Sequence, residues 1–265
     1  MLPIYEAIDI IDVISEKAGH TKPWVVMAKT PNGLKAFIVK LYSTEQVDQF
    51  HCVSKEIICN LLASEFDFTV PQCALIQIPE ELSFKLSSEN QQQYDNADCR
   101  PKFATQMIDS VKNAIPTLPK KYFQQRISLD TLYAFDNFIR NSDRGHPKTN
   151  LLLHSKDAFL IDHELTLNYQ DIVNIDFRTL QLEDKFSKYH LFYSYLSKSN
   201  KKTKQKFFIE FEFYLNSLNI NMLKPYFNQL VNEGFDDYSQ PICNWLSHVK
   251  QNSTIFVNKL KGSLQ

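Results

Sequence analysis

Short runs of alternating hydrophobic and polar residues fill much of the first third of the chain, and such alternation is typical of half-buried strands. We predict strands over residues 8–14, 24–30 and 34–42. A Pro-Asn-Gly sequence at residues 31–33 is a strong turn signal between the last two. A further strand is predicted over residues 70–78. The beginning of the chain is therefore expected to be rich in strands.

Helical patterns take over at other places. Ser43 opens a capping-box sequence that ends in a glutamine three residues later, and we predict that its helix runs to about residue 65. Apolar residues recur at helical spacing over residues 129–139, which predicts a second helix. Residues 87–100 are polar, with three consecutive glutamines, and we predict a mobile loop there. From about residue 120 onward we expect mostly helices.

One hairpin is expected to interrupt these helices. Two apolar runs flank residues 155–157, and a three-residue connection would pair His154 with Ala158. Continued outward, this register places Asn150 opposite Asp162, with Cβ atoms about 4.5–5.5 Å apart. An amide oxygen and a carboxylate at that separation suit Mg²⁺, which takes oxygen ligands. The prediction depends on register, because a slip of one residue would put the two side chains on opposite faces.

A carboxylate lies between the predicted helix and this hairpin. Asp143 is followed by Gly145 and Pro147, which prevent the helix from continuing, so we place it on an irregular loop. A carboxylate there can accept a proton from an attacking hydroxyl. The alternative is an ordinary surface ion pair between Asp143 and Arg144.

A lysine and a glutamate form a second constellation. Lys40 lies within an apolar strand, where an isolated amine would be costly. Glu56 follows on the next predicted helix, in a row otherwise formed by Cys52, Cys59 and Ala63. A strand lysine paired with a helix glutamate positions the amine on phosphate oxygens, as in kinases. The alternative is a lysine that extends to the solvent beside an exposed Glu56.

Composition narrows the choice of function. The 265 residues include 20 Phe and 12 Tyr, enough for a large aromatic core, and the net charge of −1 argues against nucleic-acid binding by bulk electrostatics. We interpret the lysines of residues 201–206 as a solvated turn. The N-terminus does not look like a signal peptide, and no segment reaches the ~20 apolar residues that span a bilayer. Five scattered cysteines favour a reducing cytoplasm.

The sequence resembles the HipA-like kinase family, bacterial relatives of the HipA serine/threonine kinase toxins. The most specific similarity is the stretch from Phe135 to His163, with its Asn-Ser-Asp-Arg, Asn-Leu-Leu-Leu and Leu-Ile-Asp-His segments. The residues that carry the resemblance are 37–41, 56, 70–71, 103–104, 135–136, 141–144, 150–153, 160–163, 190–192 and 245–246.

The resemblance implies an α+β, two-lobed protein-kinase-like fold. The small strand-rich N-terminal lobe would bind the nucleotide and span residues 1–82. Residues 83–118 would connect it to a mainly helical C-terminal lobe, residues 119–265, which carries the catalytic loop and the metal-binding hairpin.

The resemblance also implies roles for five side chains in the transfer of the ATP γ-phosphate to a protein hydroxyl. Lys40 would contact the ATP phosphates, and Glu56 would orient the lysine. Asp143 would be the catalytic base. Asn150 and Asp162 would hold Mg²⁺.

Departures from the usual kinase pattern concern the nucleotide. The step from Asp143 to Asn150 is seven residues instead of about five, and a Gly-x-Gly-x-x-Gly loop is missing. Gly19, His20 and Thr21 would have to cover the phosphates, and Thr21 is a candidate autophosphorylation site. His146 and Glu164 each allow two interpretations. His146 would shape the catalytic loop or lie near a phosphate, and Glu164 is either a further metal ligand or a strand-end carboxylate.

Three functions remain open: a serine/threonine protein kinase, a noncatalytic nucleotide-binding or partner-binding pseudokinase, and a small-molecule or lipid kinase. The expected partners are a protein substrate and an antitoxin-type regulator, with neither nucleic acid nor membrane. A serine hydrolase would need a Gly-x-Ser-x-Gly elbow, which the sequence lacks. A histidine metal site is disfavoured, because the predicted hairpin puts His154 away from the metal end and His163 on the other face from Asp162.

Overall fold

The computed structural model describes residues 1–14, 22–84, 86–145, 148–173, 175–176 and 182–265. The chain forms two compact units, each assembled from separate stretches of sequence. Unit 1 comprises Met1–Ile58, Pro71–Asp109 and Leu223–Tyr238, and unit 2 comprises Cys59–Val70, Ser110–Met222 and Ser239–Gln265. Strands concentrate toward the N-terminus and helices toward the C-terminus, as the sequence predicts.

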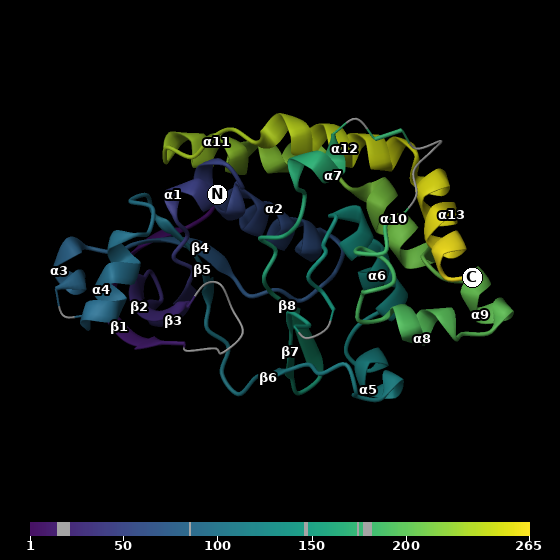
Figure 1. Ribbon diagram of the computed structural model, residues 1–265, viewed down its shortest axis with the longest axis horizontal. Coiled ribbons are helices and arrows are strands. Elements are labelled where there is room, and N and C mark those ends of the chain that lie inside the picture. The colour runs from purple at the N-terminus through teal and green to yellow at the C-terminus, as the bar shows by residue number, and fades with distance from the viewer. Residues whose placement is uncertain (15–21, 85, 146–147, 174, 177–181) are drawn as a thin grey trace. The chain divides into compact units, whose positions relative to one another are not determined.

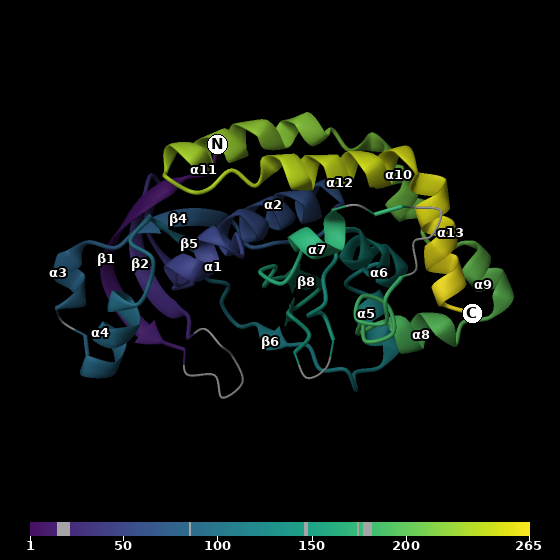
Figure 2. The same ribbon diagram turned by 45° about the horizontal axis from the view of Figure 1, so that its top comes forward.

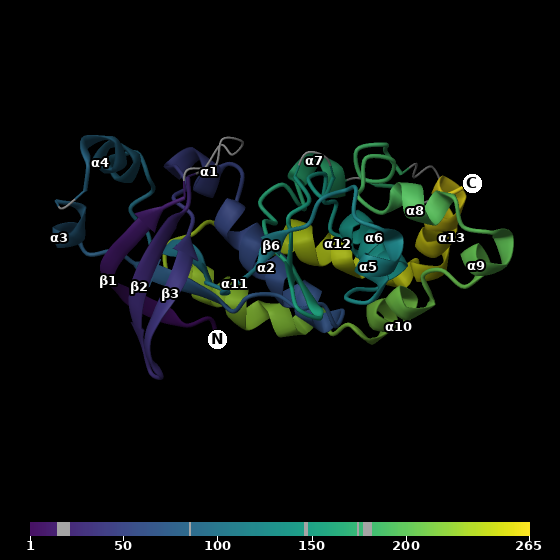
Figure 3. The ribbon, with the colours of Figure 1, turned by 90° about the horizontal axis from the view of Figure 1, so that it is seen from below.

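Unit 1 is built around a closed barrel of five strands in the order β1-β2-β3-β5-β4. The strands are β1 (Ile4–Val13), β2 (Trp24–Thr30), β3 (Gly33–Val39), β4 (Cys73–Gln77) and β5 (Lys102–Gln106). Strand β1 pairs with β2 in antiparallel orientation and with β4 in parallel orientation. The pairing with β4 closes the barrel. Figure 3 shows β1, β2 and β3 side by side. The strand predicted over residues 24–30 has the same ends in the structure, and the other three predicted strands are present with shifted ends. Strand β5 and the closure were not predicted.

The turn between β2 and β3 and the barrel interior follow from residue type. Gly33 takes φ +98°, a conformation that favours glycine, and it pairs with Thr30 to close a two-residue turn. The interior is apolar, which stabilises the closed sheet by removing hydrophobic surface from water. Its buried residues include Trp24, Val26, Ala28, Phe37, Val39, Ala74, Ile76 and Ala104.

The capping box is confirmed, but the predicted helix is interrupted. The Ser43 hydroxyl accepts from the Gln46 backbone N–H at 3.3 Å, and the Gln46 side chain accepts from the Ser43 N–H at 2.9 Å. Helix α1 ends after one turn and a half, because His51 takes a left-handed φ of +51°. Two helices therefore replace the single predicted one: α1 (Thr44–Asp48) and α2 (Cys52–Glu65).

The prediction of a mobile loop over residues 87–100 is wrong. Most of this segment is a helix, α4 (Ser88–Asp95), which Ser87 caps through its hydroxyl. The Trp24 indole donates to the Gln93 side chain at 3.1 Å, and the Tyr94 ring stacks on Trp24 with centroids 6.1 Å apart. The polar composition concealed a helix whose glutamines and tyrosine attach it to β2.

Two further helices belong to unit 1. They are α3 (Glu80–Ser83) and α11 (Lys224–Asn232). The Gln229 side chain on α11 bonds both backbone groups of Leu2, at 2.9 and 2.8 Å, so a late helix holds the start of the chain. Figure 2 shows α11 beside the N-terminus.

Unit 2 is organised around α6 (Leu129–Phe138), in which every residue except Asp130 is buried. Phe66 packs on Phe135 and Phe138 with ring centroids 5.2 and 5.5 Å apart. The Trp245 indole donates to the Phe138 carbonyl at 2.7 Å, which fixes the end of the helix. Figure 1 shows α10 and α13, which pack together in this unit.

Unit 2 also contains short strands and further helices. They are β6 (Lys112–Asn113), α5 (Lys120–Gln124), β7 (Leu151–His154), β8 (Asp157–Leu160), α7 (Tyr169–Ile172), α8 (Tyr193–Ser197), α9 (Lys201–Gln205), α10 (Ile209–Ser217), α12 (Ser239–Gln251) and α13 (Ser253–Ser263). A short 3-10 helix, Ile220–Leu223, follows α10.

Candidate active site

The predicted register of the β7–β8 hairpin is wrong by one residue. The strands pair His154 with Asp157, so the turn has two residues and His154 does not pair with Ala158. Ser155 takes a left-handed φ of +46° in this turn although it is not a glycine. Asn150 consequently lies across from Ile161, whose backbone N–H donates to the Asn150 carbonyl at 3.2 Å.

The corrected register does not decide where the Asn150 and Asp162 side chains point. Both residues lie beyond the strand ends and take left-handed φ values of +46° and +62°. The alternation of faces along a strand therefore does not extend to them. The direction of each side chain therefore follows from its own backbone conformation.

Asn150 reaches back to Asp143. Its side-chain amide donates to the Asp143 carboxylate at 2.9 Å and to the Asp143 main-chain carbonyl at 3.1 Å. These bonds use the nitrogen of the amide, so the amide oxygen remains the atom suited to a metal. The predicted loop position of Asp143 is confirmed, and the loop is closed by these bonds.

The Asp143 carboxyl is half-buried and binds its proton more tightly than an ordinary aspartate. Burial raises its pKa, and the negative charge of Asp162 acts in the same direction. The bond from Asn150 and the charges of Lys148 and Arg144 oppose the rise without cancelling it. A carboxylate with a raised pKa is a better proton acceptor, which is what a general base requires.

Arg144 forms its ion pair with Asp136, not with Asp143. Its guanidinium and the Asp136 carboxylate are both 0% exposed, and Nε lies 2.6 Å from the carboxylate oxygen. Nη1 donates to the Asn150 carbonyl at 2.5 Å. The alternative of an exposed Asp143–Arg144 pair is therefore wrong. Arg144 connects helix α6 to the residue that begins the hairpin.

Asp136 is the centre of this buried network. It also accepts from the Asn141 amide at 2.8 Å and lies 2.9 Å from His190 Nε2. The Phe192 N–H donates to His190 Nδ1, which leaves the proton on Nε2 to be donated to Asp136. Burial alone would raise the pKa of Asp136, but Arg144 and His190 hold it below its usual range. The network fixes the loop that carries Asp143.

Sequence reasoning did not assign roles to Asp136, Arg144 and His190. The available signal was a single carboxylate at Asp136 on a helix of otherwise apolar spacing, because a buried acid needs donors. Its partners lie 8 and 54 residues away, and local patterns do not encode such distances.

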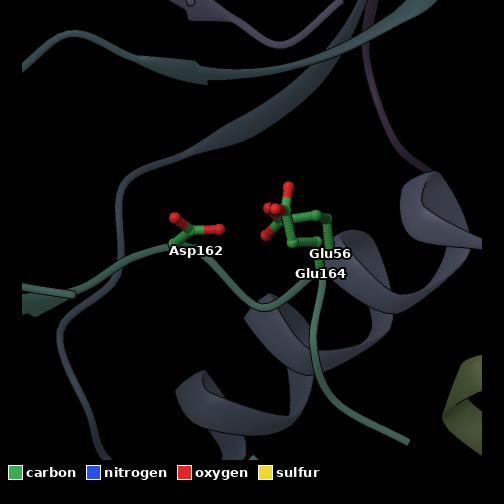
Figure 4. A group of neighbouring side chains, drawn as sticks. All are labelled: Glu56, Asp162 and Glu164. Carbon is green, nitrogen blue, oxygen red and sulfur yellow. The ribbon is translucent and has the colours of Figure 1, made fainter. Parts of the chain in front are cut away.

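Two carboxylates follow β8. Asp162 and Glu164 each offer an oxygen, and these atoms lie within 4.8 Å of each other. Figure 4 shows both side chains on the segment after β8, and Glu56 on helix α2. Oxygen atoms of this kind, together with the Asn150 amide oxygen, fit a hard cation such as Mg²⁺. This proximity favours the metal-ligand reading of Glu164 over the strand-end reading.

The predicted Lys40–Glu56 pair is present in unit 1. Lys40 directly follows β3, and its amine lies 2.5 Å from a carboxylate oxygen of Glu56. The Tyr42 hydroxyl donates to the same oxygen at 3.1 Å. Glu56 is only 1% exposed, so the alternative with an exposed glutamate is wrong. The pair holds a cationic nitrogen in a fixed place beside the barrel.

Gly19, His20, Thr21 and His146 lie outside the described residues, and their roles stay predictions. Within the described ranges, no helix is long and apolar enough to cross a membrane.

Comparison with known proteins identifies the family. A family model described as HipA-like kinase matches residues 8–218. The match includes the second half of β1, the other four barrel strands, the Lys40–Glu56 pair, the catalytic-loop candidate and the hairpin. The chain belongs to the HipA-like kinase family. A search of curated proteins finds no match.

Proposed function

We propose that this protein is an ATP-dependent serine/threonine protein kinase. The single observation that carries the proposal is the bond between Asn150 and Asp143, because it joins a candidate metal ligand to a candidate base. The family match supports a phosphotransferase of the kinase type. The barrel and the helical unit would serve as the two lobes of a kinase-like fold. Lobe boundaries at about residues 82 and 119 stay predictions.

Each proposed role follows from a side chain's chemistry. The Lys40 amine, held by Glu56, would bind ATP phosphate oxygens. Asn150 and Asp162, with Glu164, would hold Mg²⁺, which neutralises phosphate charge when bound. Asp143 would accept the hydroxyl proton while the hydroxyl oxygen bonds to the γ-phosphorus. The bond from that phosphorus to the β–γ bridging oxygen breaks, and ADP leaves.

A noncatalytic module on the same fold is the second candidate. The long Asp143–Asn150 step and the missing glycine-rich loop favour it. Against it, all five polar groups expected of an active kinase are present. A small-molecule or lipid kinase would use the same groups on a different acceptor. A protein substrate and an antitoxin-type regulator remain the expected partners.

Incubation of the purified chain with γ-labelled ATP and a cell lysate tests the proposal, with Asp143→Asn as the control. Label on a protein in the wild-type reaction alone supports it. Label confined to a lipid or small-molecule extract supports the third candidate. A thermal-shift titration with ATP, with and without Mg²⁺, completes the design. A Mg²⁺-dependent shift without transfer indicates a pseudokinase, and the absence of any shift contradicts both nucleotide functions.

A further inference from the structure

Unit 2 contains a cavity of about 540 Å³ that includes none of the proposed catalytic or metal-binding residues. Its volume is within the range of pockets that hold ligands. Buried apolar side chains contribute much of its lining: Phe66, Phe68, Ile127, Leu129, Leu196 and Phe207. Polar residues, many of them exposed, contribute the rest. A site of this kind suits a ligand with both apolar and polar parts.

Five charged side chains line the cavity. Asp67, Asp130, Glu210, Lys120 and Arg126 all line it, yet none of the five forms an ion pair within the described part of the chain. Three negative charges therefore face two positive ones in one cavity. The lining therefore carries one negative charge in excess, and Lys120 acts on Asp130 as a nearby charge without an ion pair.

The two cations are already engaged with neutral groups. The Lys120 amine donates to the Tyr195 carbonyl and to the Ser199 hydroxyl, each at 3.1 Å. The Arg126 guanidinium lies 3.8 Å from the centre of the Tyr122 ring and donates to the Tyr122 carbonyl. Each of the two cations therefore contacts uncharged groups close to it.

The carboxylates of Asp130 and Glu210 can each accept further hydrogen bonds. Asp130 accepts from the Phe208 N–H at 2.7 Å, and Glu210 accepts from the Thr131 hydroxyl at 2.6 Å, each through one carboxylate oxygen. Burial raises the pKa of Asp130, and the nearby charge of Glu210 raises it further, whereas the bond from the Phe208 N–H and the charge of Lys120 oppose the rise without cancelling it. A cation between these two carboxylates would relieve their repulsion.

We propose that this cavity docks a short segment of the protein substrate in which a lysine or arginine is flanked by apolar residues. The cationic side chain would lie between Asp130 and Glu210, and the apolar neighbours would cover the phenylalanine and leucine side chains. The exposed amides of Gln124 and Gln125 would bond the peptide backbone. The inference rests on the proposed function, because it assumes that the docked segment belongs to a protein substrate of the kinase.

The cavity also adjoins the elements that carry the candidate active site. Ala158 of β8 lines it, and so does Thr69, whose carbonyl accepts from the Leu160 N–H at 3.0 Å. Strand β8 leads directly to Asp162. Phe66, in the lining, packs on Phe138 near the end of α6. A docked segment would therefore lie against the same hairpin and helix that position Asp162 and Asp143.

The test is fluorescence anisotropy with a labelled peptide of alternating lysine and leucine, and with its counterpart that carries glutamate in place of lysine. We expect the lysine peptide to bind the wild type and to bind Asp130→Asn/Glu210→Gln about tenfold more weakly. Glu212→Gln is the matched control, because it removes one charge from the same helix outside the cavity lining. Binding of the lysine peptide should weaken between about 50 mM and about 500 mM NaCl as screening increases.

Both substitutions keep an oxygen that can accept the existing hydrogen bonds, and thermal unfolding checks that the variants are folded. The proposal is overturned if the lysine peptide does not bind the wild type, if the double variant binds it equally well, or if the glutamate peptide binds as tightly. Asp143→Asn is expected to lose transfer and retain the peptide. Because the binding assay needs no ATP, failure of docking and failure of the kinase function give different results.

Discussion

The side chain of Asn150 bonds both the carboxylate and the carbonyl of Asp143, at 2.9 and 3.1 Å, across a step of seven residues. Protein kinases separate the corresponding residues by about five positions. Within the step, the Gly145 N–H donates to the Lys148 carbonyl at 3.1 Å, which brings these two residues close together. The longer step therefore leaves the proposed base and the proposed metal ligand in contact.

Replacement of Asp143 by Asn tests the base. We expect phosphate transfer to fall by about 10²–10⁴-fold while Mg-ATP binding is retained, because only the proton acceptor is lost. Single-turnover transfer from γ-labelled ATP measures the first effect, and a thermal-shift titration measures the second. The raised pKa means that ionised Asp143 costs the folded state free energy at neutral pH, so the variant should unfold at an equal or higher temperature. Transfer at the wild-type rate would remove Asp143 from the mechanism.

The pH dependence of transfer should reflect the environment of Asp143. Only the ionised carboxylate accepts a proton, and its pKa is raised, so activity should be lost on acidification at a higher pH than an ordinary aspartate would give. The positive charge of Lys148 lowers this pKa. Lys148→Met should therefore move the acid limb of the kcat profile to still higher pH. Lys156→Met, in the hairpin turn, is the control; equal displacement in both variants would point to a general charge effect instead.

The two carboxylates after β8 predict a graded loss of metal-dependent binding. We expect Asp162→Asn to raise the Kd for Mg-ATP by about tenfold or more, and Glu164→Gln to raise it by less. Binding of ATP without Mg²⁺ should be unchanged in both variants. Isothermal titration with and without Mg²⁺ measures this, with Asp157→Asn at the exposed first residue of β8 as the control. If Glu164→Gln binds Mg-ATP like the wild type, Glu164 is only a strand-end carboxylate.

Much of unit 1 could be predicted from the sequence, because alternation and turn residues are local signals. The strand at residues 24–30 and the turn that ends at Gly33 are examples. Closure of the barrel depends on the pairing of β1 with β4, about 70 residues further along the chain, and local patterns do not encode it. Helix α4 was missed because its polar residues form bonds to Trp24 and Lys22 that only the folded chain provides.

Part of the candidate site could likewise be predicted from the sequence, and part could not. Lys40 and Glu56 were predicted as partners because each is a lone charge in an apolar row. The hairpin register was missed because Ser155 takes a left-handed conformation that favours glycine, which shortens the turn by one residue. The contact between Asp136 and His190 spans 54 residues and links two segments that have no common pattern.

The Lys40–Glu56 pair should show strong energetic coupling. The two side chains are 14% and 2% exposed, so their attraction is little screened by water. We expect Lys40→Met and Glu56→Gln each to destabilise the protein, and the double variant to be less destabilised than the sum of the two. Urea unfolding of the four proteins measures the coupling free energy, expected at about 1–3 kcal/mol. Additive losses would show that the pair contributes no net coupling. Lys40→Met should also raise the KM for ATP.

Gly145 is expected to tolerate no side chain. A Cβ atom built on it would lie 2.4 Å from the Tyr189 carbonyl oxygen, a backbone atom that cannot rotate away. The same segment donates from the Leu191 N–H to the Arg144 carbonyl at 2.8 Å, so the close approach is fixed on both sides. We expect Gly145→Ala to cost about 1–3 kcal/mol of unfolding free energy. The substitution should also lower kcat, because relief of the clash with Tyr189 displaces the loop that carries Asp143.

Gly262→Ala is the matched control for this substitution. Gly262 lies in helix α13, and nothing is within 4 Å of its Cβ position. Alanine there should raise stability by about 0.5–1 kcal/mol, because glycine is a poor helix former, and it should leave kcat unchanged. Urea unfolding and transfer kinetics on the two variants separate a local clash from a general effect of alanine. Wild-type stability and kcat in Gly145→Ala would mean that the loop can move away from Tyr189 without loss of its catalytic geometry.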